Sequence, residues 1–177
     1  MKKINIAKEL KDNQTVLMLT TGDKYNDAVL EVTKQLANNT LCYVTLNKTH
    51  HSLEDTFKKK KISTKNMIFI DAISKSIREM DDQSKNGFFV SSPAALTELS
   101  IIISKFLKHE FEYLIFDSIS TMSAYQNKNI IVRFITNLAN KIKESETKSV
   151  FFALDSKEQE DLNKQCGTIV DKVVEIK

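Results

Sequence analysis

Short apolar runs alternate with amphipathic segments along almost the whole chain, and this alternation constrains the fold more than any other feature. Runs of consecutive apolar residues, rich in Val, Ile and Phe, occur at six places: 16–20, 41–46, 67–70, 113–116, 149–154 and 169–176. Strands that are buried on both faces of a sheet have this pattern. The last run is more polar, so we expect it to form an edge of the sheet.

The segments between these runs have the period of amphipathic helices. One stripe of the first helix consists of Tyr25, Val29, Val32 and Leu36. A wider apolar face further along consists of Ile130, Ile131, Phe134, Ile135, Leu138 and Ile142. Segment 91–107 begins with serines and Pro93, which predicts a capped helix with proline in its first turn. Strands that alternate with helices predict an α/β fold, with a mostly parallel sheet and helices on both faces.

Glycine and proline are rare, which bears on the number of domains. The 177 residues include three glycines and one proline, so no linker of these residues divides the chain. We therefore predict a single domain over residues 1–177, with 78–87 as a mobile loop. The formal charge of +3 is too small to predict a nucleic-acid or membrane surface. No apolar segment reaches the roughly 20 residues of a membrane span.

Cysteine, histidine and lysine add few candidate sites. Cys42 and Cys166 are the two cysteines, and with no signal peptide at the start they predict free thiols in a reducing cytoplasm. The adjacent histidines at 50–51 are expected on the surface, and no zinc site is predicted. A thiol site of Cys166 with His109 or Asp171 would require the fold to bring them together. The lysines at 58–61 are expected at the end of a short helix, where cations suit the helix dipole.

The turn after the first apolar run is where a phosphate-binding loop would lie. The segment "TVLMLTTGDKYNDAVL" passes from an apolar run through a polar turn into a helical pattern. A P-loop reads G-x-x-x-x-G-K followed by Ser or Thr, and its lysine reaches the phosphates. The alignment that fits best takes Gly22 as the second glycine of this motif, and Leu17 then stands at the position of the first glycine. In this alignment Asp23 replaces the lysine, and Lys24 replaces the Ser or Thr. An aspartate there repels phosphate, although Lys24 is flexible enough to serve in place of the missing lysine.

A simpler interpretation of the same turn is structural. Asp23 is expected to cap a helix that begins near Lys24, and Gly22 to supply the turn. Capping alone accounts for these residue types, so we prefer it to phosphate binding.

Several segments resemble, in order, the KaiC-like branch of the RecA superfamily, an archaeal-type ATPase domain. "TLCYVTLNKTHHSLEDTF" is similar to its second strand and the helix that follows, and "NMIFIDAISKSI" to its next strand. "YLIFDSIST" resembles the Walker B strand, with Asp117 and Ser118 after four apolar residues. "SVFFALDSKEQEDL" and "IVDKVVEIK" resemble the two closing strands. The resemblance implies a RecA-like three-layer sandwich, with the strand at 149–154 between the first strand and the Walker B strand.

The departures from the family pattern concern its chemistry. The family's second strand ends in a pair of acidic residues, one of them the catalytic glutamate, where this chain has Asn47 and Lys48. Neither side chain can accept a proton from water at neutral pH. Asp117 remains; in the family it orders water on Mg²⁺, and here it could instead hydrogen-bond backbone or Ser118.

Together these features predict a RecA-like domain that has lost ATP hydrolysis, with no cofactor or metal. It would regulate or scaffold other proteins in the cytoplasm, with itself or an active RecA-like relative as partner, and nucleic acid is not expected. Gly22, Lys24 and Asp117 would form a vestigial nucleotide site. One alternative is a weak ATPase that uses Lys24 and Asp117 with ATP and Mg²⁺. Another is a sensor for a different anion at the N-terminus of the first helix.

Overall fold

A computed structural model describes residues 4–109 and 111–176, which form seven strands and eight α-helices. The strands are β1 (Thr15–Thr20), β2 (Leu41–Thr45), β3 (Met67–Asp71), β4 (Gly87–Phe89), β5 (Tyr113–Asp117), β6 (Lys148–Leu154) and β7 (Lys172–Ile176). The helices are α1 (Ile6–Asp12), α2 (Tyr25–Leu36), α3 (His50–Lys59), α4 (Ser74–Ile77), α5 (Leu96–Leu107), α6 (Ile119–Met122), α7 (Lys128–Lys143) and α8 (Glu160–Gly167), with a 3₁₀ turn η1 (Lys157–Gln159).

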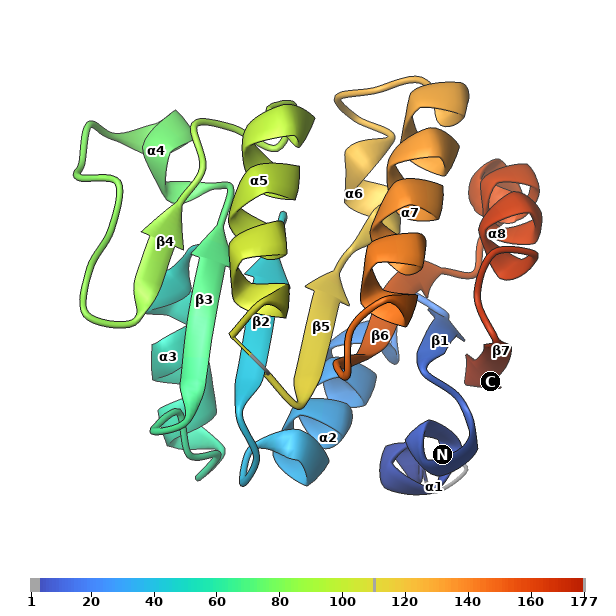
Figure 1. The fold of residues 1–177 in the computed structure, drawn as a ribbon, viewed down its shortest axis with the longest axis horizontal. Coiled ribbons are helices and arrows are strands. Elements are labelled where there is room, and N and C mark those ends of the chain that lie inside the picture. The colour runs from blue at the N-terminus through green and yellow to red at the C-terminus, as the bar shows by residue number, and fades with distance from the viewer. Residues whose placement is uncertain (1–3, 110, 177) are drawn as a thin grey trace.

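The strands form one sheet in the order β4-β3-β2-β5-β6-β1-β7, and all neighbouring pairs are parallel. Strand β6 lies between β1 and β5, which confirms the position expected from the family resemblance. Strand β7 is an edge strand, as its polar sequence predicts. Because parallel strands need crossover connections, the helices lie on both faces of the sheet (Figure 1).

Two hydrophobic cores, one on each face of the sheet, make this a three-layer α/β sandwich. Residues of α5, α7 and α8 pack on one face, and residues of α1, α2 and α3 pack on the other. Neighbouring residues of a strand point to opposite faces, so that Phe116 belongs to the first core and Ile115 to the second. The whole predicted stripe of α2 is buried, which confirms that this helix packs on the sheet.

The structure corrects three local predictions. The last residue of segment 78–87, Gly87, begins a seventh strand, β4, which the sequence pattern does not reveal because it has only three residues. Helix α5 begins at Leu96 with Ala95 at its N-cap, so Pro93 lies in the preceding turn and not in the helix. Ile130, predicted to be on the apolar face of α7, is 41% exposed.

Helix α3 ends as expected, but of the two histidines at its start only one lies on the surface as expected. Lys58 and Lys59 occupy its last turn, where their charges favour the helix dipole. His51 is exposed, but His50 is buried against the ring of Phe69. Gly87 allows this burial, because a Cβ atom there would lie 2.7 Å from Nδ1 of His50.

Candidate functional site

Asp117 ends strand β5 at the carboxyl edge of the sheet, the edge where open α/β sheets bind their ligands. Asp117 alternates with Phe116 and so faces the layer of α1, α2 and α3. In the register of the sheet it is paired with Thr45 of the neighbouring strand β2. Its side chain therefore lies next to the carboxyl end of β2 and the start of α2.

Three side chains donate hydrogen bonds to the Asp117 carboxylate. The Tyr25 hydroxyl, from the first turn of α2, lies 2.5 Å from Oδ1, and the Tyr43 hydroxyl, from β2, lies 2.7 Å from Oδ2. Nδ2 of Asn47, just after β2, donates to Oδ1 at 2.9 Å. We call these four residues the Asp117 network. Its carboxylate is a buried charge satisfied by donors from three segments, as a buried carboxylate must be.

Burial and charge keep both tyrosines protonated. Burial is the largest cause that raises the pKa of Tyr25, and the negative charge of Asp117 raises it further. The pKa of Tyr43 is raised well above its ordinary value for the same two reasons. A protonated phenol is the form that can donate to a carboxylate. Both tyrosines are therefore neutral donors to the Asp117 carboxylate over the whole physiological pH range.

The residues at the family's acidic pair have structural roles. Asn47 donates to Asp117, and Lys48 donates through Nζ to Oδ1 of Asn26 at 2.6 Å. The Thr45 hydroxyl donates to the Lys48 carbonyl and fixes the turn after β2. Both side chains are therefore engaged by other residues of the chain.

The turn before α2 differs in part from the prediction. Gly22 and Asp23 lie exposed in a turn closed by a hydrogen bond from the Lys24 amide to the Thr21 carbonyl. The prediction that Asp23 caps α2 is wrong: Lys24 is the N-cap residue, and no side chain caps this helix. None of the described glycines has a positive φ, and a Cβ on Gly22 would meet no atom within 4 Å. Gly22 therefore lacks both features that make a glycine necessary in a phosphate loop.

These residues do not fit a magnesium nucleotide. Mg²⁺ requires oxygen ligands at about 2.0–2.1 Å in octahedral geometry. Asp117 is 1% exposed, and three of its roughly four lone-pair positions already accept hydrogen bonds. The prediction that Asp117 forms hydrogen bonds with the backbone or Ser118 is also wrong, because its partners are two tyrosines and an asparagine. No step of ATP chemistry can be derived from this arrangement.

The other candidate residues are not assembled into sites. Asp171 accepts hydrogen bonds from the Thr15 amide and hydroxyl and pairs with Lys143 at 2.9 Å, which accounts for its carboxylate. Cys166 is buried, and burial raises the pKa of its thiol to about 12. Among residues 4–109 and 111–176, no group of three His, Cys, Asp or Glu side chains could hold a metal ion.

The two tyrosines are the part of the site that the sequence interpretation missed. Tyr25 is assigned to the apolar stripe of α2, and Tyr43 lies in an apolar run where every residue of β2 is buried. A buried tyrosine hydroxyl usually finds a hydrogen-bond partner. That rule, applied to Tyr43 and to an aspartate at the end of a buried strand, is the signal that could have identified the network.

Comparisons with known proteins agree with the strand order. No family model matches the sequence, and no curated protein matches it. The KaiC-like protein PH0186 from Pyrococcus horikoshii aligns with a TM-score of 0.61 at 11% identity, over 93% of this chain and 72% of that one. Flagellar accessory protein FlaH from Methanocaldococcus jannaschii gives 0.63 at 12% identity, over 99% and 77%.

A third solved structure is similar over the same region. The uncharacterized protein PH0321 from Pyrococcus horikoshii, in complex with an unknown peptide, aligns with a TM-score of 0.70 at 10% identity, over 96% of this chain and 82% of that one. At sequence identities this low, structural similarity shows a shared fold and does not show a shared activity. The chain therefore has the RecA-like α/β fold, shared with KaiC-like protein PH0186 and with FlaH.

Proposed function

We propose that this chain is a RecA-like domain that does not hydrolyse ATP and that acts through contacts with other proteins. The observation that carries the proposal is the Asp117 network. Its aspartate occupies the end of the Walker B-like strand, yet the side chains around it donate hydrogen bonds to its carboxylate where a metal site would present ligands.

The missing catalytic groups support the same conclusion independently. Asn47 and Lys48 stand at the position of the catalytic base, and Asp23 stands at that of the P-loop lysine. A weak ATPase that uses Lys24 and Asp117 would have to break the hydrogen bonds of both tyrosines before magnesium could reach the carboxylate. This cost makes the ATPase alternative the less favourable one.

A role in protein contacts has separate support. PH0321, which has the same fold, was solved in complex with an unknown peptide. We infer partners that are proteins, either a second copy or a RecA-like relative, and a cytoplasmic location in which the buried thiols of Cys42 and Cys166 stay reduced. In residues 4–109 and 111–176, no helix has the length and apolar character needed to cross a membrane.

Steady-state phosphate release tests the proposal. We expect no turnover above the buffer blank when the purified protein is assayed with millimolar ATP and magnesium. Asp117→Asn is the matched variant, because it removes the charge that magnesium would need and keeps the size of the side chain. Magnesium-dependent turnover in the unmodified protein that is lost in Asp117→Asn would overturn the proposal.

A further inference from the structure

The surface between α5 and α7 is hollowed along most of the length of α5. A hollow of 350 Å³ lies toward the N-terminal ends of the two helices, and a pocket of 600 Å³ lies where both helices end. Together we call them the α5–α7 groove. It lies on the face of the sheet opposite to α2, so it is separate from the Asp117 network (Figure 1).

The first part of the groove has exposed apolar walls. Ile101 of α5 is 54% exposed and Ile130 of α7 is 41% exposed, and both line the same hollow with Leu96 and Phe134. These are two of the five large hydrophobic side chains that the described residues leave exposed. Apolar side chains on both walls of one hollow indicate a contact surface, whereas single exposed ones need no explanation.

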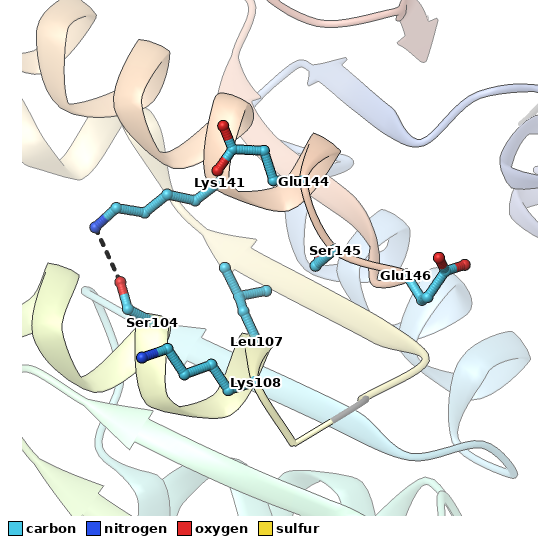
Figure 2. Close-up of a pocket in the computed structure, with 7 residues that line it drawn as sticks. All are labelled: Ser104, Leu107, Lys108, Lys141, Glu144, Ser145 and Glu146. Carbon is cyan, nitrogen blue, oxygen red and sulfur yellow. Dashed lines mark hydrogen bonds between the residues drawn. The ribbon is translucent and has the colours of Figure 1, made fainter.

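Basic side chains line both parts of the groove. Arg133 lines the first hollow, and Lys108 and Lys141 line the pocket. Nζ of Lys141 reaches across the groove and donates to the hydroxyl of Ser100 at 3.0 Å. It also donates to the hydroxyl of Ser104 at 2.9 Å (Figure 2). None of the three cations forms an ion pair with another residue in the described part of the chain.

Acidic side chains lie only at the far end of the pocket. Glu144 and Glu146 follow the last turn of α7, and neither forms an ion pair with Lys108 or Lys141. Figure 2 shows the Glu146 carboxylate directed away from both ammonium groups. The cations therefore remain available to carboxylates that a partner supplies. Complementary charge of this kind fixes the orientation of a partner and speeds its association.

The walls of the groove determine what kind of backbone can occupy it. Both walls are α-helices, whose amide and carbonyl groups are bonded within each helix, so a strand could not extend a sheet here. A helix satisfies its own backbone and needs only side-chain contacts. Helix α5 has 12 residues and so extends for about 18 Å, enough for about three turns of a partner helix.

We propose that the α5–α7 groove binds an amphipathic helix of a partner protein, with an apolar stripe flanked by Asp or Glu. The apolar stripe contacts Ile101 and Ile130, and the acidic side chains meet Arg133, Lys108 and Lys141. This inference rests on the scaffolding function proposed above and names its surface and its partner.

A second copy of the chain offers no such helix among its described residues. The acidic first turn of α8 already pairs, Glu160 with Lys164 and Asp161 with Lys128. The apolar residues of α1, α2 and α3 are packed on the sheet, and α5 and α7 themselves form the walls of the groove. The partner is therefore a different protein.

Fluorescence anisotropy with three designed peptides of about 18 residues tests the proposal, since shorter isolated helices are only marginally stable. The first has a Leu stripe flanked by Glu, the second has the same stripe flanked by Lys, and the third has the composition of the first with the stripe scrambled. We expect the first to bind about tenfold or more tightly than the other two, because it alone matches both the apolar and the basic parts of the groove.

Variants of the protein locate the binding. Ile101→Ser and Arg133→Glu should each weaken binding of the Glu-flanked peptide about tenfold. Ile77→Ser and Lys59→Glu, at exposed positions outside the groove, are the matched controls and should leave it unchanged. Circular dichroism shows whether each variant is folded.

Three results would overturn the inference: equal binding of the three peptides, binding that survives Ile101→Ser, or binding that the control variants weaken as much. Sedimentation velocity adds a fourth, namely a dimer of the unmodified protein that Ile101→Ser dissociates, since the groove would then bind a second copy. Failure here leaves the proposed loss of ATP hydrolysis standing, because that proposal fails only if the protein releases phosphate from ATP.

Discussion

The Asp117 network and the α5–α7 groove use polar side chains in opposite ways. In the network, a buried carboxylate accepts hydrogen bonds from Tyr25, Tyr43 and Asn47, so its bonding capacity is used within the chain. In the groove, Arg133 and Lys108 are without ion pairs among the described residues, and Ile101 is exposed. Polar groups at the carboxyl edge of the sheet are thus satisfied within the chain, whereas those of the groove on the other face are open, and this difference is why we propose that binding takes place at the groove.

The largest expected effect is on the network. Asp117→Asn should lower the free energy of unfolding by about 3 kcal/mol, because it removes the charge and turns an NH2 group toward at least one of the three donors. Urea denaturation measures this change. Asp23→Asn, at an exposed position, is the control and should change stability by less than about 0.5 kcal/mol. If Asp117→Asn stabilised the protein, the carboxylate would be a strained functional group and the comparison would fail.

Removing one donor at a time should have a smaller effect. Tyr25→Phe and Tyr43→Phe each lose one hydrogen bond to a buried charge, which we expect to cost about 2 kcal/mol. Tyr125→Phe is the control, since Tyr125 is 47% exposed. A double-mutant cycle of Tyr25→Phe with Asp117→Asn should show clear coupling; strictly additive costs would mean that the hydroxyl and the carboxylate do not interact.

Two glycines sharpen the comparison between buried and open positions. Gly87→Ala should destabilise by about 1.5 kcal/mol, because the new methyl group overlaps the ring of His50 and must displace it. Gly22→Ala should change stability by less than about 0.5 kcal/mol, because nothing lies near its Cβ position and its φ is not positive. Thermal unfolding measures both changes. A large loss of stability in Gly22→Ala would show that the turn before α2 requires a glycine.

Alkaline pH tests the raised pKa values of the tyrosines. Folding raises both pKa values above the ordinary value of 10, so the unfolded chain loses these protons first. Stability from this source is therefore complete below pH 10 and falls above it, by about 1.4 kcal/mol per tyrosine at pH 11. Urea denaturation at several pH values should show a shallower fall for Tyr43→Phe than for the unmodified protein. Equal slopes would show that Tyr43 ionises as readily in the folded state as in the unfolded one.

Most of the fold could be predicted from the sequence, because its signals are long. Six apolar runs correspond to six of the seven strands, and the stripe from Tyr25 to Leu36 is the buried face of α2. The short strand β4 could not be predicted, because its three residues depend on pairing with β3 and on the close contact of Gly87 with His50. The prediction that Pro93 lies in the first turn of a helix is wrong because proline is favoured in turns as well as in the first turn of a helix.

Of the site, the sequence alone shows which residue types stand at the family's catalytic positions. The replacements at Asn47 and Lys48 are visible in the sequence, since an amide and an ammonium group are no bases at neutral pH. The donors that fill the space around Asp117 come from α2, β2 and the turn after β2, and only the folded sheet brings them together. The groove is likewise hidden, because its walls belong to helices separated in the chain by β5 and α6.

We propose that the Asp117 network closes this edge of the sheet to nucleotide, and thermal unfolding in the presence of ligand measures whether it does. A site of micromolar affinity at a hundredfold excess of ligand stabilises the folded state by about 2.7 kcal/mol, which would raise Tm by about 5–10 °C in a domain of this size. We predict no change in Tm with millimolar ATP and magnesium, and none with inorganic phosphate. A rise of several degrees with ATP that is lost in Asp117→Asn would contradict the account, and a rise with phosphate alone would establish an anion site at the start of α2.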